Sequence, residues 1–251
     1  MATAQVDLTG HVACVTGASS GLGRRAAEVL AAAGAQVVAV ARRAAALDDL
    51  AAGAGGAIAP LPFDLIDRDR LPDCAAAAAA PFGPPDIVVH AAGINTRDAA
   101  GDITPAVWDT TLTLNLAVPF FLSQALVPAM RTRGWGRIVN FASLQSFRAF
   151  PGGLAYGASK GGVAQMTRAM AQAWSRDGIT ANAIGPGFFR TELTEAVFAD
   201  PDRAARNAAQ TCIGRNGDLA DLDGPLLFLC SDMSAYVTGQ VLMVDGGFTA
   251  T

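Results

Sequence analysis

The stretch Val12-Ala13-Cys14-Val15-Thr16-Gly17-Ala18-Ser19-Ser20-Gly21-Leu22-Gly23 decides the fold. A valine-rich apolar run leads directly into a turn with three glycines, and a helical pattern follows. Glycine allows a positive φ and a close approach of backbone to a ligand, and a helix N-terminus offers free N–H groups to a phosphate. In this strand–turn–helix context the motif predicts a pyrophosphate site rather than a purely structural turn. The predicted contacts are Gly17, Ser19, Ser20, Gly21, Leu22 and Gly23.

The second apolar run ends in Val40-Ala41-Arg42-Arg43, and this end indicates which dinucleotide binds. An NAD site usually has an acidic residue here for the ribose 2′-hydroxyl. This chain has two arginines and no carboxylate, and arginine binds phosphate through paired, charge-assisted hydrogen bonds. We therefore expect NADP(H) to be preferred over NAD(H), with Arg42 as the 2′-phosphate ligand and Arg43 at the start of the next helix.

Short apolar runs alternate with longer helical patterns along the rest of the chain, which implies parallel strands joined by right-handed crossovers. The predicted strands are His11–Thr16, Gln36–Ala41, Ala57–Phe63, Ile87–His90, Gly136–Phe141, Ile179–Ile184 and Gln240–Val244. The predicted helices are Leu22–Ala33, Arg43–Ala52, Arg68–Ala80, Pro105–Arg131, Ala155–Arg176 and Leu219–Ser231. We expect an α/β, single-domain Rossmann fold over residues 1–251: a seven-stranded doubly wound parallel sheet with helices on both faces. The rhythm breaks at about 187–217, where a small substrate lid is expected.

Composition and charge exclude several classes of protein. The 251 residues are 51% hydrophobic and carry a net charge of −4 with scattered arginines, so no nucleic-acid partner is expected. No basic region precedes a long apolar run at the N-terminus, and no apolar run approaches about 18 residues, so neither a signal peptide nor a membrane span is expected. The four cysteines form no Cys-x-x-Cys pair and the two histidines lie far apart. We expect reduced thiols in a cytoplasmic protein and no metal site.

Lys160 is the only lysine, because the other 17 of the 18 basic residues are arginine. It follows Tyr156 by four residues, and positions i and i+4 share a face of a helix. A nearby ammonium favours phenolate and would lower the pKa of the tyrosine from its usual value of about 10. The pair therefore predicts a general acid/base, with a chance surface pair as the alternative.

Several motifs recur in one order along the chain: Thr16-Gly17-x-x-x-Gly21-x-Gly23, His90-Ala91-Ala92-Gly93, Asn115, Ser143, Tyr156-x-x-x-Lys160 and Pro186-Gly187. In order and spacing the chain resembles the short-chain dehydrogenase/reductases of about 250 residues, and the resemblance covers essentially the whole chain. His90 departs from the family, which usually has asparagine there. We expect a core-edge histidine whose side chain is satisfied by backbone.

The resemblance implies a catalytic set. Tyr156 would donate a proton to the carbonyl oxygen as hydride arrives, and Lys160 would bind the nicotinamide ribose. Ser143 would hold the developing alkoxide, and Asn115 would hold a water that links the lysine to solvent. The implied cofactor contacts are Asp64, Leu65, Ala91, Ala92, Gly93, Tyr156, Lys160, Pro186, Gly187 and Thr191. Asp64 could equally cap the turn that follows it.

Pro119 lies four residues after Asn115 in the same helical pattern. Proline lacks the N–H that would bond the carbonyl of residue 115. We therefore expect a local kink that leaves this carbonyl free for water, with a kink of no functional consequence as the alternative.

The substrate pocket is expected from the residues after Ser143 and after Pro186. Its predicted lining is Gln145, Phe150, Phe188 and Phe189. Aromatic rings suit an apolar ketone, whereas Gln145, Arg148 and Arg190 could bind the hydroxyls or carboxylate of a sugar acid. The sequence of these segments resembles the branch of the family that includes gluconate 5-dehydrogenases and carbonyl reductases. Both substrate classes, sugar acids and apolar ketones, remain open.

Two other functions and an assembly state complete the expectations. A 3-oxoacyl-[acyl-carrier-protein] reductase would need a basic surface such as Arg131, Arg133, Arg137, Arg168 and Arg176, although scattered arginines that balance acidic neighbours explain these equally well. A non-catalytic NADP(H)-binding sensor or scaffold would share the fold, but it has no need of a proton-transfer set. The long, apolar helices 105–131 and 155–176 predict a homotetramer.

Overall fold

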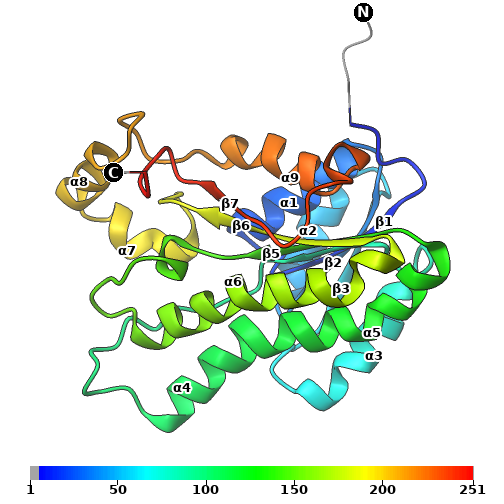
Figure 1. Ribbon diagram of the computed structural model, residues 1–251, viewed down its shortest axis with the longest axis horizontal. Helices are drawn as coiled ribbons and strands as arrows, with labels where there is room; N and C mark the ends of the chain where they lie inside the picture. The colour runs from blue at the N-terminus through cyan, green and yellow to red at the C-terminus, as the bar shows by residue number, and fades with distance from the viewer. Residues whose placement is uncertain (1–5, 251) are drawn as a thin grey trace, which may run out of the picture.

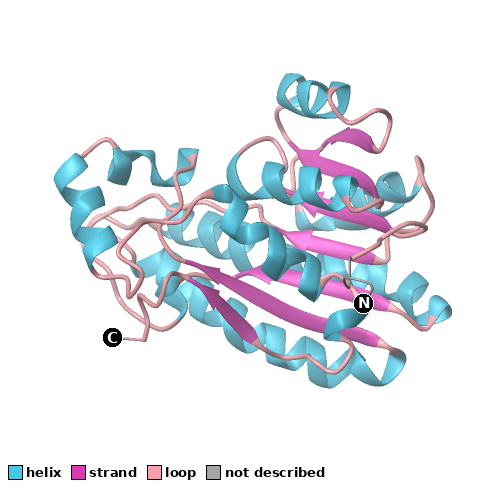
Figure 2. Ribbon diagram, turned by 90° about the horizontal axis from the view of Figure 1, so that it is seen from above, coloured by secondary structure: helices cyan, strands magenta, loops and turns pink. Residues whose placement is uncertain are grey.

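The computed structural model describes residues 6–250 and contains a seven-stranded sheet in the order β3-β2-β1-β4-β5-β6-β7 (Figures 1 and 2). Every neighbouring pair of strands is parallel, as predicted. The order reverses between β1 and β4, which places a crevice at their carboxyl ends. The strands are β1 Val12–Thr16, β2 Gln36–Ala41, β3 Ile58–Pro62, β4 Ile87–His90, β5 Gly136–Phe141, β6 Ile179–Pro186 and β7 Val241–Val244.

Helices cover both faces of the sheet (Figure 1). Ala13 and Val15 of β1 pack on one side, whereas Cys14 between them packs on the other, so the strand is apolar from Val12 to Val15 and ends in the buried Thr16. The face with α1, α2 and α9 and the face with α3, α5 and α6 each have a hydrophobic cluster. The helices are α1 Gly21–Ala32, α2 Ala44–Ala52, α3 Leu71–Ala79, α4 Pro105–Leu112, α5 Val118–Arg133, α6 Leu154–Trp174, α7 Glu195–Phe198, α8 Pro201–Ala209 and α9 Asp223–Leu229.

The predicted single helix 105–131 is in fact α4 and α5 joined by a π turn at Thr113–Ala117. The N–H of Val118 donates to the carbonyl of Thr113, five residues back. This whole stretch, Pro105–Arg133, is the one helix among residues 6–250 that is long and apolar enough to cross a membrane. It packs against α3 and α6 and supplies part of a core cluster, so these contacts account for part of its apolar character.

The segment between β6 and α9, residues 187–217, contains the short helices α7 and α8 and is named here the lid segment. Its first helical turn is the 3-10 turn Glu192–Thr194, for which Thr191 forms a capping box with Thr194. An isolated bridge between Phe189 and Gly217 holds its two ends together. The lid segment and the C-terminal residues lie beside the carboxyl ends of β6 and β7 (Figure 1).

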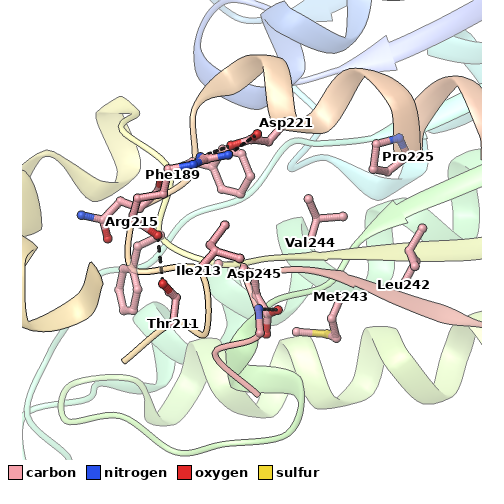
Figure 3. Close-up of a pocket in the computed structure, with 16 residues that line it drawn as sticks. Phe189, Thr211, Ile213, Arg215, Asp221, Pro225, Leu242, Met243, Val244 and Asp245 are labelled. Carbon is pink, nitrogen blue, oxygen red and sulfur yellow. Dashed lines mark hydrogen bonds and ion pairs between the residues drawn. The ribbon is translucent and has the colours of Figure 1, made fainter. Parts of the chain in front are cut away.

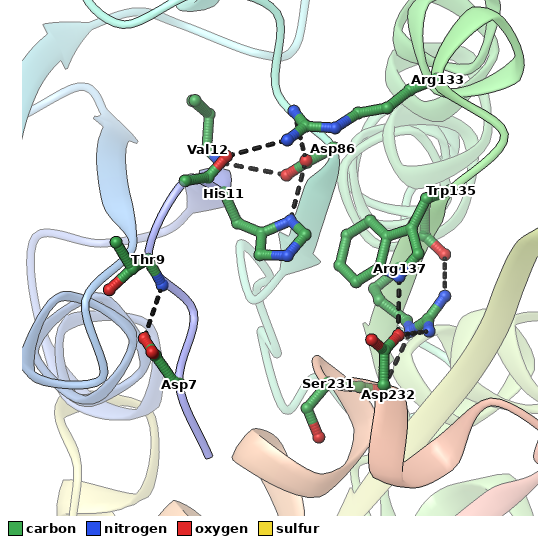
Figure 4. A network of polar contacts seen from close by, with 12 residues as sticks. Asp7, Thr9, His11, Val12, Asp86, Arg133, Trp135, Arg137, Ser231 and Asp232 are labelled. Carbon is green, nitrogen blue, oxygen red and sulfur yellow. Dashed lines mark hydrogen bonds and ion pairs between the residues drawn. The ribbon is translucent and has the colours of Figure 1, made fainter.

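A polar network closes the opposite, amino edge of the sheet (Figure 4). The carboxylate of Asp86 is 2% exposed and contacts Nδ1 of His11 at 2.9 Å and a guanidinium nitrogen of Arg133 at 2.7 Å. The indole of Trp135 stacks between the His11 ring and the buried Arg137, with separations of 4.1 and 4.2 Å. Because a buried charge must be paired to be tolerated, His11 and Arg133 are the partners that allow the Asp86 carboxylate to lie buried at this edge.

Candidate active site

The predicted phosphate loop connects β1 to α1 at the carboxyl edge. Gly17 and Gly21 have φ values of +70° and +56°. A Cβ on Gly17 would lie 2.7 Å from the backbone N of Ala92, and one on Gly23 would lie 2.3 Å from the carbonyl O of Gly17. Any larger residue at these two positions would therefore displace backbone. Ser20 is the N-cap of α1, yet its side chain makes no capping hydrogen bond. The first N–H groups of the helix are thus free to bind an anion, which fits a dinucleotide pyrophosphate.

The two arginines after β2 both border this loop, but Arg43 reaches the serines. Its guanidinium donates to Oγ of Ser19 at 3.0 Å and to Oγ of Ser20 at 2.8 Å. It also forms a bidentate ion pair with the carboxylate of Glu192 in the lid segment, with N···O distances of 3.0 and 2.9 Å. Arg42 is exposed beside it. The expectation that Arg43 only starts a helix was incomplete, because its side chain turns back from the N-cap of α2 onto the loop.

Two connected cavities lie over the carboxyl edge. The larger has a volume of about 520 Å³ and is lined by the phosphate loop, Arg42, Arg43, Asp64, Leu65 and Ala91–Gly93. The smaller, about 150 Å³, is lined by Ser143, Tyr156, Lys160 and the predicted substrate residues Gln145, Phe150, Phe188 and Phe189, with Pro186 and Gly187. Thr191 and Leu193 border both cavities. The predicted site residues are thus brought together, except that Asn115 lies behind the cavities.

Asp64 also uses its side chain locally, because Oδ1 accepts from the N–H of Ile66 at 3.2 Å. The turn that the sequence offered as the alternative to an adenine contact is therefore present. The residue still lines the larger cavity, so the turn and a ligand contact are compatible.

Ser143, Tyr156 and Lys160 form one polar group at the floor of the smaller cavity. The Ser143 side chain is hydrogen-bonded to Tyr156. The Lys160 ammonium lies 5.6 Å from the centre of the tyrosine ring and donates to the carbonyl O of Phe141 at 2.6 Å. The i, i+4 pair on α6 therefore faces the site as predicted, and Lys160 is 5% exposed.

The expected lowering of the Tyr156 pKa is wrong for this structure. Burial raises the pKa of Tyr156, while the Ser143 hydrogen bond and the charge of Arg97 act in the opposite direction. Lys160 does not offset burial, because its ammonium binds the Phe141 carbonyl rather than the phenol oxygen. Burial also lowers the pKa of Lys160 to about 8. A phenol that keeps its proton at neutral pH suits proton donation to a carbonyl oxygen.

Asn115 lies in the π turn and is 1% exposed. Its side chain accepts from the N–H of Ile94 at 2.9 Å and donates to Oγ of Ser159 at 3.0 Å. It therefore links the loop after β4 to the helix that carries Tyr156. The helix is irregular just before Pro119 in the form of this π turn, which often marks functional sites, whereas the expected kink and free carbonyl stay predictions. The water that the Asn115 carbonyl would hold stays a prediction.

One of the two ring nitrogens of His90 has a hydrogen-bond partner, which is a side chain rather than backbone, and the buried Nδ1 has none among residues 6–250. Its Nε2 lies 2.8 Å from Oγ of Ser123 on α5, and the residue is 2% exposed. Burial lowers the pKa of His90 to about 3, so the imidazole is neutral at physiological pH. A neutral ring beneath the sheet edge is a packing group, as the sequence indicated, although its partner was wrong.

The cations of the smaller cavity differ from those expected. Arg148 donates to the carbonyl O of Phe248 at 3.2 Å, and Arg190 lies over the Phe198 ring at 4.8 Å. Neither lines the cavity with Tyr156, whereas Arg97 and Arg203 do. The sequence analysis missed both lining arginines, because one lies in an irregular loop and the other on the lid segment.

Arg97 is held toward the site by an unusual backbone. It is the one non-glycine residue within 6–250 with a positive φ, at 60°. Its guanidinium donates to the carbonyl O of Leu193 at 2.9 Å, and its charge acts on Tyr156. Such a conformation persists only where neighbouring contacts hold it, and it often occurs at ligand-binding positions. Nothing in the residue type could have predicted this conformation.

Phenylalanines form the apolar wall of the smaller cavity. Phe188 packs edge-on against both Phe150 and Phe248, with ring centres 6.1 and 5.7 Å apart. Phe248 comes from the C-terminal segment, which the sequence did not connect with the site.

A third cavity of about 330 Å³ lies beside β7, between the lid segment and α9 (Figure 3). On the wall of this cavity Arg215 forms a bidentate ion pair with the carboxylate of Asp221, with N···O distances of 2.6 and 2.8 Å. This third cavity shares the lining residue Phe189 with the smaller cavity, but none of the proton-transfer residues lines it.

The arginines considered as a landing surface for an acidic carrier protein are largely engaged within the chain. Arg131, Arg133 and Arg137 each have an acidic partner, and Arg168 donates to Gln165. The three ion pairs are Arg131–Asp177 at 2.6 Å, Arg133–Asp86 at 2.7 Å and Arg137–Asp232 at 2.8 Å. The alternative explanation, arginines that balance acidic neighbours, is the better one for this set.

Comparisons with known proteins agree with this geometry. A family model described as enoyl-(acyl carrier protein) reductase matches residues 17–249. The chain is 40% identical to the gluconate 5-dehydrogenase of Gluconobacter oxydans over 98% of this chain and 97% of that protein. It is 36% identical to a 3-oxoacyl-[acyl-carrier-protein] reductase of Thermotoga maritima, covering 96% and 98%. A gluconate 5-dehydrogenase from Burkholderia cenocepacia, solved with NADP and tartrate, superposes with a TM-score of 0.92 at 35% identity and covers 98% of both chains.

Proposed function

The chain belongs to the short-chain dehydrogenase/reductase family, and we propose that it is an NADP(H)-dependent dehydrogenase that interconverts a keto sugar acid and the corresponding secondary alcohol. The observation that carries this proposal is the cavity that joins Tyr156 and Ser143 to a cation, Arg97. A ketone needs a proton donor and an oxyanion contact. A sugar acid adds a carboxylate, for which arginine is the natural partner.

The residues of the chain would share the reaction as follows. The nicotinamide, when bound, supplies or accepts the hydride. Ser143 donates a hydrogen bond to the carbonyl oxygen of the substrate, and Tyr156 transfers its phenolic proton to the same oxygen as negative charge develops there. Lys160 would hold the nicotinamide ribose, and its ammonium would stabilise the Tyr156 phenolate that remains after proton transfer. In the oxidative direction Tyr156 takes the proton back.

Cofactor choice rests on the loop that follows β2. Arg42 and Arg43 border the larger cavity and no carboxylate ends β2, which favours a 2′-phosphate over a free 2′-hydroxyl. The binding of NADP by the Burkholderia relative supports this preference. Three of the free cysteines are buried, Cys14, Cys74 and Cys230, in keeping with a reducing, cytoplasmic setting.

The substrate class is tested with a panel of carbonyl compounds. NADPH and NADH oxidation would be followed with 5-ketogluconate, simple aryl and alkyl ketones, β-ketoesters and an acetoacetyl thioester. We expect the highest kcat/KM for 5-ketogluconate with NADPH. A clear preference for the acetoacetyl thioester would instead favour the acyl-carrier-protein reductase function.

Arg97→Gln should raise KM for 5-ketogluconate by about 10- to 100-fold, because a charge-assisted hydrogen bond contributes about 1.5–3 kcal/mol. The KM for an uncharged ketone should change far less. Arg148→Gln is the matched control, since Arg148 binds the Phe248 carbonyl outside this cavity. Equal losses for charged and uncharged substrates in Arg97→Gln would contradict a carboxylate-binding role.

The assembly state is a separate proposal: a homotetramer built on the α4–α6 face and the β7 edge. The apolar residues of α6 give it little support, because Val163, Met170 and Trp174 are buried in the core. Support comes instead from Phe121 on α5 and Leu242 on β7, which are 39% and 38% exposed. Sedimentation equilibrium at micromolar concentration should give four times the chain mass, and a monomer would refute the proposal.

A further inference from the structure

Glu192 lies where the lid segment meets the phosphate loop. Its carboxylate accepts from both terminal nitrogens of Arg43, at 3.0 and 2.9 Å, and from Oγ of Ser20 at 2.9 Å. Arg43 in turn donates to Ser19 and Ser20. An anionic group of the chain itself thus engages the donors expected to serve a phosphate.

The same donors cannot serve two anions at full strength. A guanidinium fork that binds the Glu192 carboxylate in two places has few donors left for phosphate oxygens in that plane. A phosphate dianion placed near Arg43 would also repel the carboxylate. Glu192 and a 2′-phosphate therefore compete for Arg43, whereas a cofactor with a free 2′-hydroxyl meets no such competition.

We propose that Glu192 sets the cofactor selectivity: its carboxylate competes with the 2′-phosphate of NADP(H) for Arg43 and the loop serines, weakens NADP(H) binding relative to NAD(H), and is released with the lid segment when the phosphate binds. This inference rests on the proposed use of NADP(H). It assigns a function to a lid residue that neither transfers a proton nor lines the cavity of Tyr156.

The neighbouring residue extends the consequence to the substrate side. The carbonyl of Leu193 accepts from Arg97 at 2.9 Å, so one short turn contacts the phosphate donors through Glu192 and the cation of the smaller cavity through Leu193. Displacement of Glu192 by a phosphate thus loosens the turn that holds Arg97. Binding of the phosphorylated cofactor and positioning of that cation are coupled through this turn.

Two nucleotide fragments test the competition without any turnover. Titration calorimetry with 2′,5′-ADP and 5′-AMP compares ligands that differ in the 2′-phosphate and lack nicotinamide. Glu192→Gln should tighten 2′,5′-ADP about threefold to fivefold, in line with the modest free energy of an exposed ion pair, and change 5′-AMP by less than about twofold. Glu195→Gln is the matched control, because Glu195 forms no ion pair among residues 6–250.

A double variant separates competition from a general change in charge. Arg43→Ala should weaken 2′,5′-ADP at least about tenfold and abolish the effect of Glu192→Gln. Hydrogen exchange of residues 191–199 should rise more with 2′,5′-ADP than with 5′-AMP in the wild type. The inference is overturned if Glu192→Gln affects both fragments equally or keeps its effect without Arg43. If the wild type binds neither 2′,5′-ADP nor NADPH, the proposed cofactor itself is wrong.

Discussion

Tyr156→Phe should lower kcat for ketone reduction by about 10³- to 10⁴-fold, while NADPH still binds within about threefold of the wild-type affinity. The substitution removes one hydroxyl, the proton donor that burial keeps protonated and that is hydrogen-bonded to Ser143. General acid catalysis contributes about 10²- to 10⁴-fold to the rate. The aromatic ring itself is kept in the variant, so the shape of the cavity and the binding of NADPH should change little. Single-turnover kinetics and fluorescence titration of NADPH measure the two quantities separately.

The direction of the reaction gives this prediction a pH signature. Burial raises the pKa of Tyr156, so the phenol is protonated throughout the neutral range and ketone reduction should vary little between pH 6 and 8. Alcohol oxidation needs the phenolate, so its rate should rise about tenfold per pH unit over the same range. A flat oxidation profile in the wild type would show that another group takes the proton.

The same variant distinguishes an enzyme from a binding protein. If NADPH binding persists and turnover collapses in Tyr156→Phe, the proton-transfer set is functional. Ser143→Ala serves as the companion, because it keeps the phenol and removes its hydrogen-bonding partner. A wild type that binds NADPH but reduces no carbonyl compound would support the sensor or scaffold function instead.

The parallel sheet and the phosphate loop could be predicted because their requirements are local. Glycine is needed at 17 and 23 because other backbone lies against these positions, and at 21 because φ is +56°, while a strand buried on both faces must be largely apolar. The π turn at Thr113–Ala117 was only partly predictable, since Pro119 removes one donor but does not fix how the helix adjusts.

The functional cations were harder to predict, because their positions depend on tertiary contacts. Arg148 and Arg190 occur in the expected segments, yet each guanidinium lies over a phenylalanine ring and neither lines the Tyr156 cavity. Arg97 reaches that cavity through a positive φ that favours glycine or asparagine in isolation. Likewise Arg43 was expected only to start the next helix, but it forms an ion pair with Glu192, far along the chain, and donates to Ser19 and Ser20 of the phosphate loop.

Lys160 should be required for activity and yet lower the free energy of unfolding. Lys160→Arg keeps the charge, but the broad guanidinium does not fit a site in which the ammonium is 5% exposed and donates to the Phe141 carbonyl at 2.6 Å. We expect kcat to fall at least about 100-fold in this variant. Near-normal turnover would mean that only the charge matters.

The stability effect follows from the lowered pKa. Burial shifts the pKa of Lys160 from 10.5 to about 8, which corresponds to about 3 kcal/mol of destabilisation when the amine is protonated. Below pH 8 both the folded and unfolded chains carry the proton, so the whole penalty is present. Between pH 8 and 10.5 the unfolded chain binds more protons than the folded chain, so the free energy of unfolding rises with pH.

Lys160→Met removes the titrating amine and therefore this pH dependence. At pH 7 the variant should be at least as stable as the wild type, because relief of the burial penalty offsets the unpaired Phe141 carbonyl, which costs about 1–3 kcal/mol. From pH 8 to 10.5 the wild type should gain up to about 3 kcal/mol relative to the variant. Urea unfolding at several pH values measures this difference, and comparison of the two proteins cancels the titration of the cysteines and tyrosines. A difference in stability that does not change with pH would show that Lys160 remains protonated across this range.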